Sequence, residues 1–287
     1  MTMLRACRIA CLYIIFQMLV PAVVQAKGDY LALGHITYTD ANTPQEFSFN
    51  ADTFKTLVYS YSFFEKYEIG FVVDFNETEE EVNNTAILLG IEGSFIRIKR
   101  GRNTGKFNGV PFDYERNSIQ WYRLGIGGGG DAKPLWGIFN GLTYTKFSSP
   151  GEIFDDDQSE FVPIRQIDVV MLGMVGVTDL MRKKMLNSYR KSDWGFESDA
   201  AFGLARITPH HPQYKEVSTI AFEGTLKAGY YWKLFHNDPY TADESAGGLF
   251  LGYRYDFLFD FLGLYRSGDS IYIPERGGWE VRLSFEF

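Results

Sequence analysis

The chain has 287 residues, a formal net charge of −8 and 17% aromatic residues, with 25 Phe and 18 Tyr. The acidic balance argues against nucleic acid as a partner. Both cysteines, Cys7 and Cys11, lie near the N-terminus, so the rest of the chain has no disulfide and no cysteine metal site.

The first 26 residues have the pattern of a cleaved secretory signal. Arg5 and Arg8 precede an apolar stretch over residues 9–24, and Val24 and Ala26 frame a small-x-small cleavage pattern. The alternative is a membrane-anchoring helix. With cleavage, a single domain over 27–287 has 26 basic side chains against 36 acidic ones, and no cysteine follows the cut to carry a lipid anchor.

After this segment, no run of 18 consecutive apolar residues occurs, so no transmembrane helix is expected. Many aromatics with modest overall hydrophobicity are instead typical of a membrane β-barrel. Its strands alternate lipid-facing and lumen-facing side chains, so the average hides the lipid face. We therefore expect an all-β fold, a closed antiparallel up-and-down transmembrane barrel.

Period-two alternation recurs along the chain and predicts strands. Over 67–75 the odd positions are apolar and oppose Glu68, Gly70 and Asp74. Over 165–177 the odd positions, Ile167 to Val177, are predicted on the apolar outer face and Asp168 on the other. Similar segments indicate twelve strands, at 30–38, 54–63, 67–76, 85–92, 95–100, 114–126, 135–147, 164–177, 193–207, 217–233, 247–259 and 279–287.

Ten strands are the alternative, because the links 178–192 and 234–246 are long for periplasmic turns. The outer loops are expected at 39–53, 77–84, 101–113, 148–163, 208–216 and 260–278. The basic link 179–191 is expected to be a solvated connector, or else a contact for anionic lipid heads.

The histidines do not form a recognisable catalytic or metal pattern. They are His35, His210, His211 and His236, and none belongs to a His-x-Ser, Asp-x-His or His-Ser motif of the kinds used by outer-membrane phospholipase A, omptin proteases or lipid A deacylases. A triad assembled from distant strands stays open. We expect no enzyme activity, no cofactor and no metal.

The last nine residues alternate without a break. Polar residues at 280, 282, 284 and 286 oppose an apolar face formed by Trp279, Val281, Leu283, Phe285 and Phe287. This resembles the C-terminal signal by which the barrel assembly machinery recognises outer-membrane barrels. It predicts the bacterial outer membrane as the location, with membrane lipid and lipopolysaccharide as neighbours.

Charged residues of both signs are predicted to point into the lumen. They are Glu68, Asp74, Glu92, Arg97, Lys99, Asp168, Glu197, Asp199, Glu223, Lys227, Arg254, Asp256, Glu280, Arg282 and Glu286. Because buried charges are costly unless paired, the lumen is expected to be either a small aqueous channel or a salt-bridged plug.

Size, strand number and the C-terminal strand together resemble the translocator barrel of autotransporters, in particular the solitary barrels without a passenger. That resemblance implies a barrel that lacks a passenger domain. The leading functional hypothesis is a small passive, porin-like channel. The alternatives are a closed structural or surface-interaction barrel that binds partners through its outer loops, and an outer-membrane lipid-modifying enzyme. The oligomeric state stays open.

Overall fold

The computed structural model describes most of the chain between Tyr30 and Glu286. The described residues are 30–40, 47–49, 53–63, 67–76, 81–91, 94–123, 141–155, 160–179, 191–236, 246–260, 270–272 and 275–286. The predicted signal over 1–26, Glu92, Phe287 and most of the basic link 179–191 lie outside these ranges. Among the described residues, no helix has the length and apolarity that crossing a bilayer requires.

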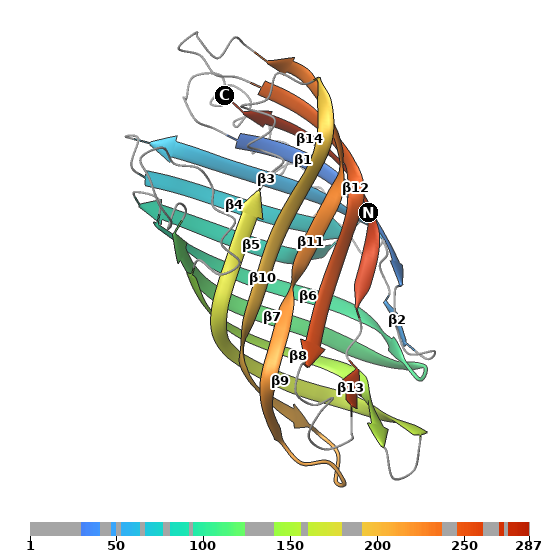
Figure 1. Ribbon diagram of the computed structural model, residues 1–287. Coiled ribbons are helices and arrows are strands. Elements are labelled where there is room, and N and C mark those ends of the chain that lie inside the picture. The colour runs from blue at the N-terminus through green and yellow to red at the C-terminus, as the bar shows by residue number, and fades with distance from the viewer. Residues whose placement is uncertain are drawn as a thin grey trace, which may run out of the picture.

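Fourteen strands occur in this part of the chain (Figure 1). They are β1 (Tyr30–Asp40), β2 (Phe47–Phe49), β3 (Thr53–Phe63), β4 (Tyr67–Asn76), β5 (Glu81–Ile91), β6 (Ser94–Phe107), β7 (Val110–Arg123), β8 (Gly141–Asp155), β9 (Glu160–Asp179), β10 (Ser192–Pro209), β11 (Val217–His236), β12 (Ala246–Asp260), β13 (Ser270–Tyr272) and β14 (Arg276–Glu286).

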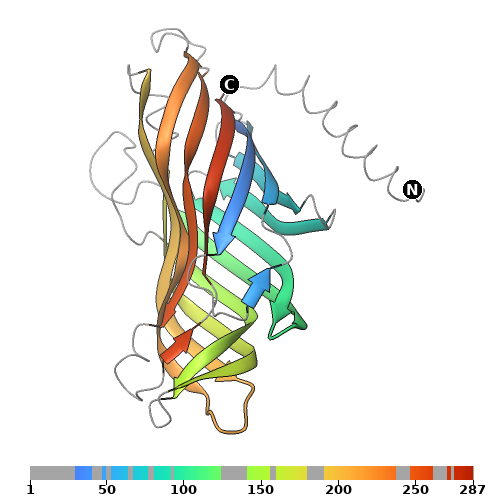
Figure 2. The ribbon, with the colours of Figure 1, turned by 90° about the vertical axis from the view of Figure 1, so that its right-hand side faces the viewer.

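Twelve of these strands close into one antiparallel ring. Each pairs with the next along the chain, from β1 and β3 through β12 to β14, and β14 pairs back with β1. In Figure 2 the last strand, in dark red, lies beside the first, in blue. The two short strands lie beside the ring, β2 on β6 and β13 on β8. The closed twelve-stranded up-and-down barrel is therefore confirmed.

The seam between β1 and β14 carries the alternation predicted for the C-terminal strand. Trp279 and Val281 are exposed on the outside at 58% and 43%, whereas Glu280, Arg282 and Ser284 are buried on the inside. We call the end of the barrel at Tyr30 and Glu286, which face each other across this seam, the terminal end. The opposite end is the loop end.

Several strands run farther toward the loop end than predicted. The predicted loop over 101–113 is instead a hairpin of β6 and β7, joined by Asn108 and Gly109 with positive φ values of 50° and 73°. Such an Asn-Gly pair is typical of a two-residue hairpin turn. The predicted loop over 148–163 is mostly the paired ends of β8 and β9. Gly, Pro and polar residues interrupt the apolar alternation in these segments, so the sequence pattern did not reveal the strands, although Phe107 and Ile153 are buried.

The inner and outer faces of β9 are the reverse of the prediction. Ile167, Val169 and Met171 lie inside the barrel at 1% exposure or less, in a cluster with Phe147, Val175 and Ala201. Leu172 and Met174 point outward, at 66% and 45% exposure. Both faces of β9 are apolar near the terminal end, so the prediction relied on Asp168 and Gln166 to mark the inner face. That assignment was wrong. Their polar side chains lie outside the barrel rather than in the lumen.

Candidate functional site in the barrel interior

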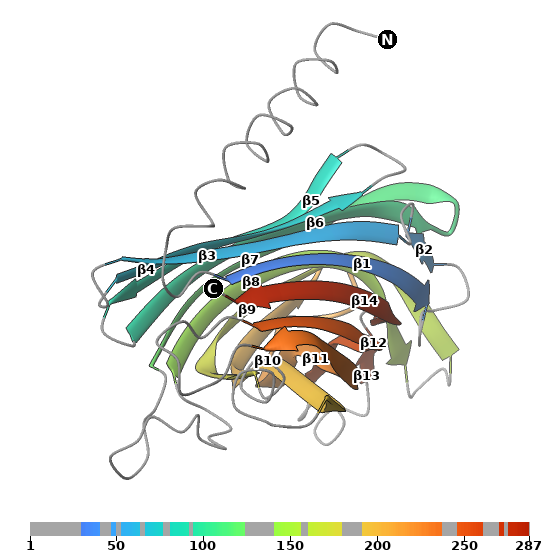
Figure 3. The same ribbon diagram turned by 90° about the horizontal axis from the view of Figure 1, so that it is seen from above.

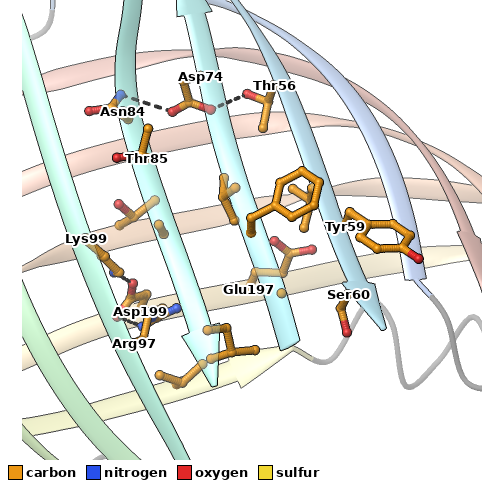
Figure 4. A pocket seen from close by; sticks show the side chains of 18 of the residues that line it. Thr56, Tyr59, Ser60, Asp74, Asn84, Thr85, Arg97, Lys99, Glu197 and Asp199 are labelled. Carbon is orange, nitrogen blue, oxygen red and sulfur yellow. Dashed lines mark hydrogen bonds and ion pairs between the residues drawn. The ribbon is translucent and has the colours of Figure 1, made fainter. Parts of the chain in front are cut away.

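The interior holds a cavity of about 370 Å³ that is lined by both charged and apolar side chains (Figure 4). It lies in the half nearer the terminal end, since its lining includes Tyr30, Ser60 and Tyr122. Its volume is at the lower end of the range of about 300–1,000 Å³ for small-molecule sites. Nine of the predicted lumen residues line it, namely Glu68, Asp74, Arg97, Lys99, Glu197, Asp199, Lys227, Arg254 and Arg282.

One ion-pair group joins β6 to β10 across the lumen. Arg97 lies 2.7 Å from the carboxylate of Asp199, and Lys99 contacts the same carboxylate. The guanidinium of Arg97 also donates to Gln120 Oε1 at 2.6 and 2.8 Å. Because β10 is four places from β6 in the ring of twelve, these side chains bridge facing walls rather than neighbouring strands (Figure 3).

A second bridge of this kind joins β7 to β11. Arg116 lies 2.8 Å from Glu223, which also accepts a hydrogen bond from the Thr145 hydroxyl at 2.6 Å. Glu223 is almost fully buried, and it was among the predicted lumen residues. Arg116 was not, although the outward Ile119 and Trp121 on the same strand give the parity that places it inside.

A third group centres on Asp74 of β4. Its carboxylate accepts hydrogen bonds from Thr56 at 2.7 Å and from Asn84 at 3.0 Å (Figure 4). Arg254 of β12, again four places away in the ring, lies 3.9 Å from Asp74. Arg254 also lies 3.1 Å from Asp256, to which Tyr38 donates at 2.7 Å.

The fourth group lies among β10, β11 and β14. Arg282 binds Glu197 with two nitrogens, one of them at 3.0 Å. Lys227 lies 3.1 Å from Glu280 and 3.7 Å from Glu197. Glu280 has no exposed surface, so its charge depends on these cations.

A second cavity of about 90 Å³ lies nearer the loop end. It shares Asn84, Arg116 and Arg254 with the first, so these side chains lie between the two spaces. Its lining includes Glu223, Asp256 and Arg276. The Arg276 guanidinium lies over the rings of Tyr38 and Phe49, 4.2 and 4.0 Å from their centroids. Arg276 was missed because residues 260–278 were predicted as a loop.

Asp168, His35, His210 and His211 are not among the residues that line these cavities. Asp168 is on the outer face of β9, where it contacts His210 at 2.8 Å and hydrogen-bonds Ser148. In a nucleophilic triad the histidine lies between serine and acid, but here the acid lies between Ser148 and His210. His35 is exposed on the outer face of β1. The structure describes the backbone of Glu286 but not its side chain.

The described residues contain no group of three or more His, Cys, Asp or Glu side chains placed to hold a metal ion.

Comparisons with known proteins give little beyond this geometry. No protein family and no curated protein matches the sequence. Among solved structures, the chain is similar to "Copper transporter OprC", with 12% identity and a TM-score of 0.25. The alignment covers 91% of this chain but only 43% of that one.

Proposed function

We propose that this protein is an integral outer-membrane barrel whose lumen is closed at rest, a structural or surface-interaction protein rather than an open pore. The proposal rests on the three bridges between facing walls, which are Arg97 and Lys99 with Asp199, Arg116 with Glu223, and Arg254 with Asp74. A permeating ion would have to separate charges that are partly buried, or fully buried in the case of Asp74 and Glu223, and that are costly to leave unpaired.

Membrane insertion is supported by the outer surface. Among the described side chains, large apolar ones are exposed on eleven of the twelve ring strands, all except β3, and they include Leu33, Ile69, Leu89, Ile98, Trp121, Leu142, Leu172, Leu204, Tyr230, Leu251 and Trp279. Soluble proteins rarely expose so large a continuous apolar area, whereas a transmembrane barrel requires an apolar band. The outer membrane is the proposed location because of the C-terminal strand.

A small passive channel is the second candidate. The observation that favours it is the first cavity, a space of about 370 Å³ inside the barrel whose lining includes charged side chains of both signs. Separation of the Arg116 and Arg254 contacts would join it to the second cavity.

Conductance in planar lipid bilayers separates the two. We expect the wild-type barrel to be silent. The double variant Asp199→Asn, Glu223→Gln removes the acidic partners of Arg97, Lys99 and Arg116, so the released cations repel one another and anion-selective steps should appear. The matched control, Asp113→Asn with Glu115→Gln, removes two exposed outer carboxylates and should stay silent.

Regular open steps from the wild-type protein in independent preparations would overturn the closed lumen and favour the channel. Silence of the double variant, in a barrel that is still folded, would show that these pairs do not close the lumen.

A further inference from the structure

Three cations lie in one row across the outer face of β6 to β10. Arg100 is paired with Asn117, which is paired with Lys146, and Lys146 connects through Val170 to Arg206. Since adjacent strands lie about 4.8 Å apart, the cations follow one another at about 10 Å. We call Arg100, Lys146 and Arg206 the cation row.

The cation row lies at the edge of the apolar band. Each of the five strands has an exposed apolar side chain two residues closer to the terminal end than its position in this row. These side chains are Ile98, Ile119, Tyr144, Leu172 and Leu204, and they are 46% to 73% exposed. Long basic side chains at such an edge keep their charge at the headgroup level while their stems cover apolar surface. We therefore expect the cations to lie close to the phosphates of the neighbouring lipids.

The cations of the row are accessible. Arg100 and Lys146 are exposed, although Arg100 also borders the first cavity. Arg206 contacts Glu216, in a pair whose side chains are 65% and 37% exposed. Such an exposed pair contributes at most about 1 kcal/mol, so a lipid phosphate can replace Glu216.

Most of the acidic side chains near the cation row are already paired with a basic side chain. In the next row toward the loop end, Asp168 is bound to His210 at 2.8 Å. Asp113, farther along β7, is bound to Arg102 at 2.8 Å. Glu115 is exposed between them, and its charge weakens the row only in part.

The opposite wall has a different edge. There Tyr253 is paired with Trp279, whose rings pack edge to face with centroids 5.6 Å apart, and Thr37 follows on β1. Aromatic side chains of this kind suit any membrane interface. Cations concentrated on β6 to β10 indicate a negatively charged lipid on that wall.

We propose that the cation row binds the phosphate groups of lipopolysaccharide in the surrounding leaflet. Three cations over about 20 Å fit a headgroup with more than one phosphate better than a single phosphate. This inference rests on the proposed outer-membrane location and is independent of whether the lumen is closed.

The test measures lipopolysaccharide binding to the full chain, refolded in detergent micelles. The triple variant Arg100→Gln, Lys146→Gln, Arg206→Gln should bind about 100-fold more weakly, at about a fivefold loss for each cation near a charged lipid surface. The matched control Lys106→Gln, Arg165→Gln, Lys215→Gln loses the same charge at exposed positions outside the row and should bind like wild type. Arg100→Lys with Arg206→Lys keeps the charge and should retain binding.

Two further ligands identify the source of the phosphate. Dephosphorylated lipopolysaccharide should bind the wild type as weakly as it binds the triple variant. Excess inorganic phosphate should not displace lipopolysaccharide; if it does, the row is a site for free phosphate and the proposal is wrong. Equal lipopolysaccharide affinity of the wild type and the triple variant would also overturn it. Channel activity of the wild-type barrel would contradict the closed lumen but not this result.

Discussion

Glu280 shows how single residues hold the interior together. Its side chain has no exposed surface, and its charge is balanced by Lys227 at 3.1 Å and Arg282 at 3.7 Å. Taking such a charge out of water costs several kcal/mol unless cations compensate. The same cations hold Glu197, so the four residues form one unit and the loss of one partner affects the others.

Glu280→Gln should therefore destabilise the barrel by about 3 kcal/mol, because it leaves the partly buried Lys227 with only the more distant Glu197. Urea unfolding in detergent micelles measures the change. Glu115→Gln, at an exposed outer position, is the matched control and should change stability by less than about 0.5 kcal/mol. A change of similar size in both variants would mean that the interior pair contributes no net stability.

At the scale of elements, sequence predicted strands well where one face is polar along the whole length. In β14, Glu280, Arg282 and Ser284 all lie inside, so the parity is unambiguous. In β9 the inner face is as apolar as the outer one, because this wall packs against Phe147 and Ala201 rather than water. Packing of β9 against its neighbours β8 and β10 decides which face is inside, and the sequence of β9 alone does not contain that information. The same limit explains why Arg276, within a predicted loop, was missed.

The face assignment of β9 can be tested by lipid-phase quenching. With Cys7 and Cys11 replaced by Ser, a fluorophore on Leu172→Cys should be quenched by nitroxide-labelled lipids, because position 172 is 66% exposed on the outside. A fluorophore on Met171→Cys, which is 1% exposed on the inside, should be protected or should fail to label. Stronger quenching at 171 than at 172 would show that β9 is turned the other way.

At the scale of the whole molecule, closure removes every strand edge from the ring. An open edge would present unpaired backbone groups, which is not tolerated in lipid because no water is present to satisfy them. The first and last strands provide this closure through eleven paired positions from Tyr30–Glu286 to Asp40–Arg276. The ion pairs inside the barrel then hold facing walls at a distance that the closed ring alone would not determine.

The pairing of β1 with β14 predicts that an engineered disulfide can link the first strand of the barrel to the last. His35 and Val281 face each other across the seam, and Val281 faces Leu251 on its other side. Directly opposite residues have Cα atoms about 4.5–5.5 Å apart, within the range of about 4.4–6.8 Å that a disulfide needs. In a background without Cys7 and Cys11, His35→Cys with Val281→Cys should crosslink on oxidation and migrate differently on non-reducing gels.

The control pair His35→Cys with Leu251→Cys is separated by two strand spacings, about 9.6 Å, and should not crosslink. If the control pair crosslinks and the seam pair does not, β14 does not lie between β1 and β12, and the order of strands in the ring is wrong.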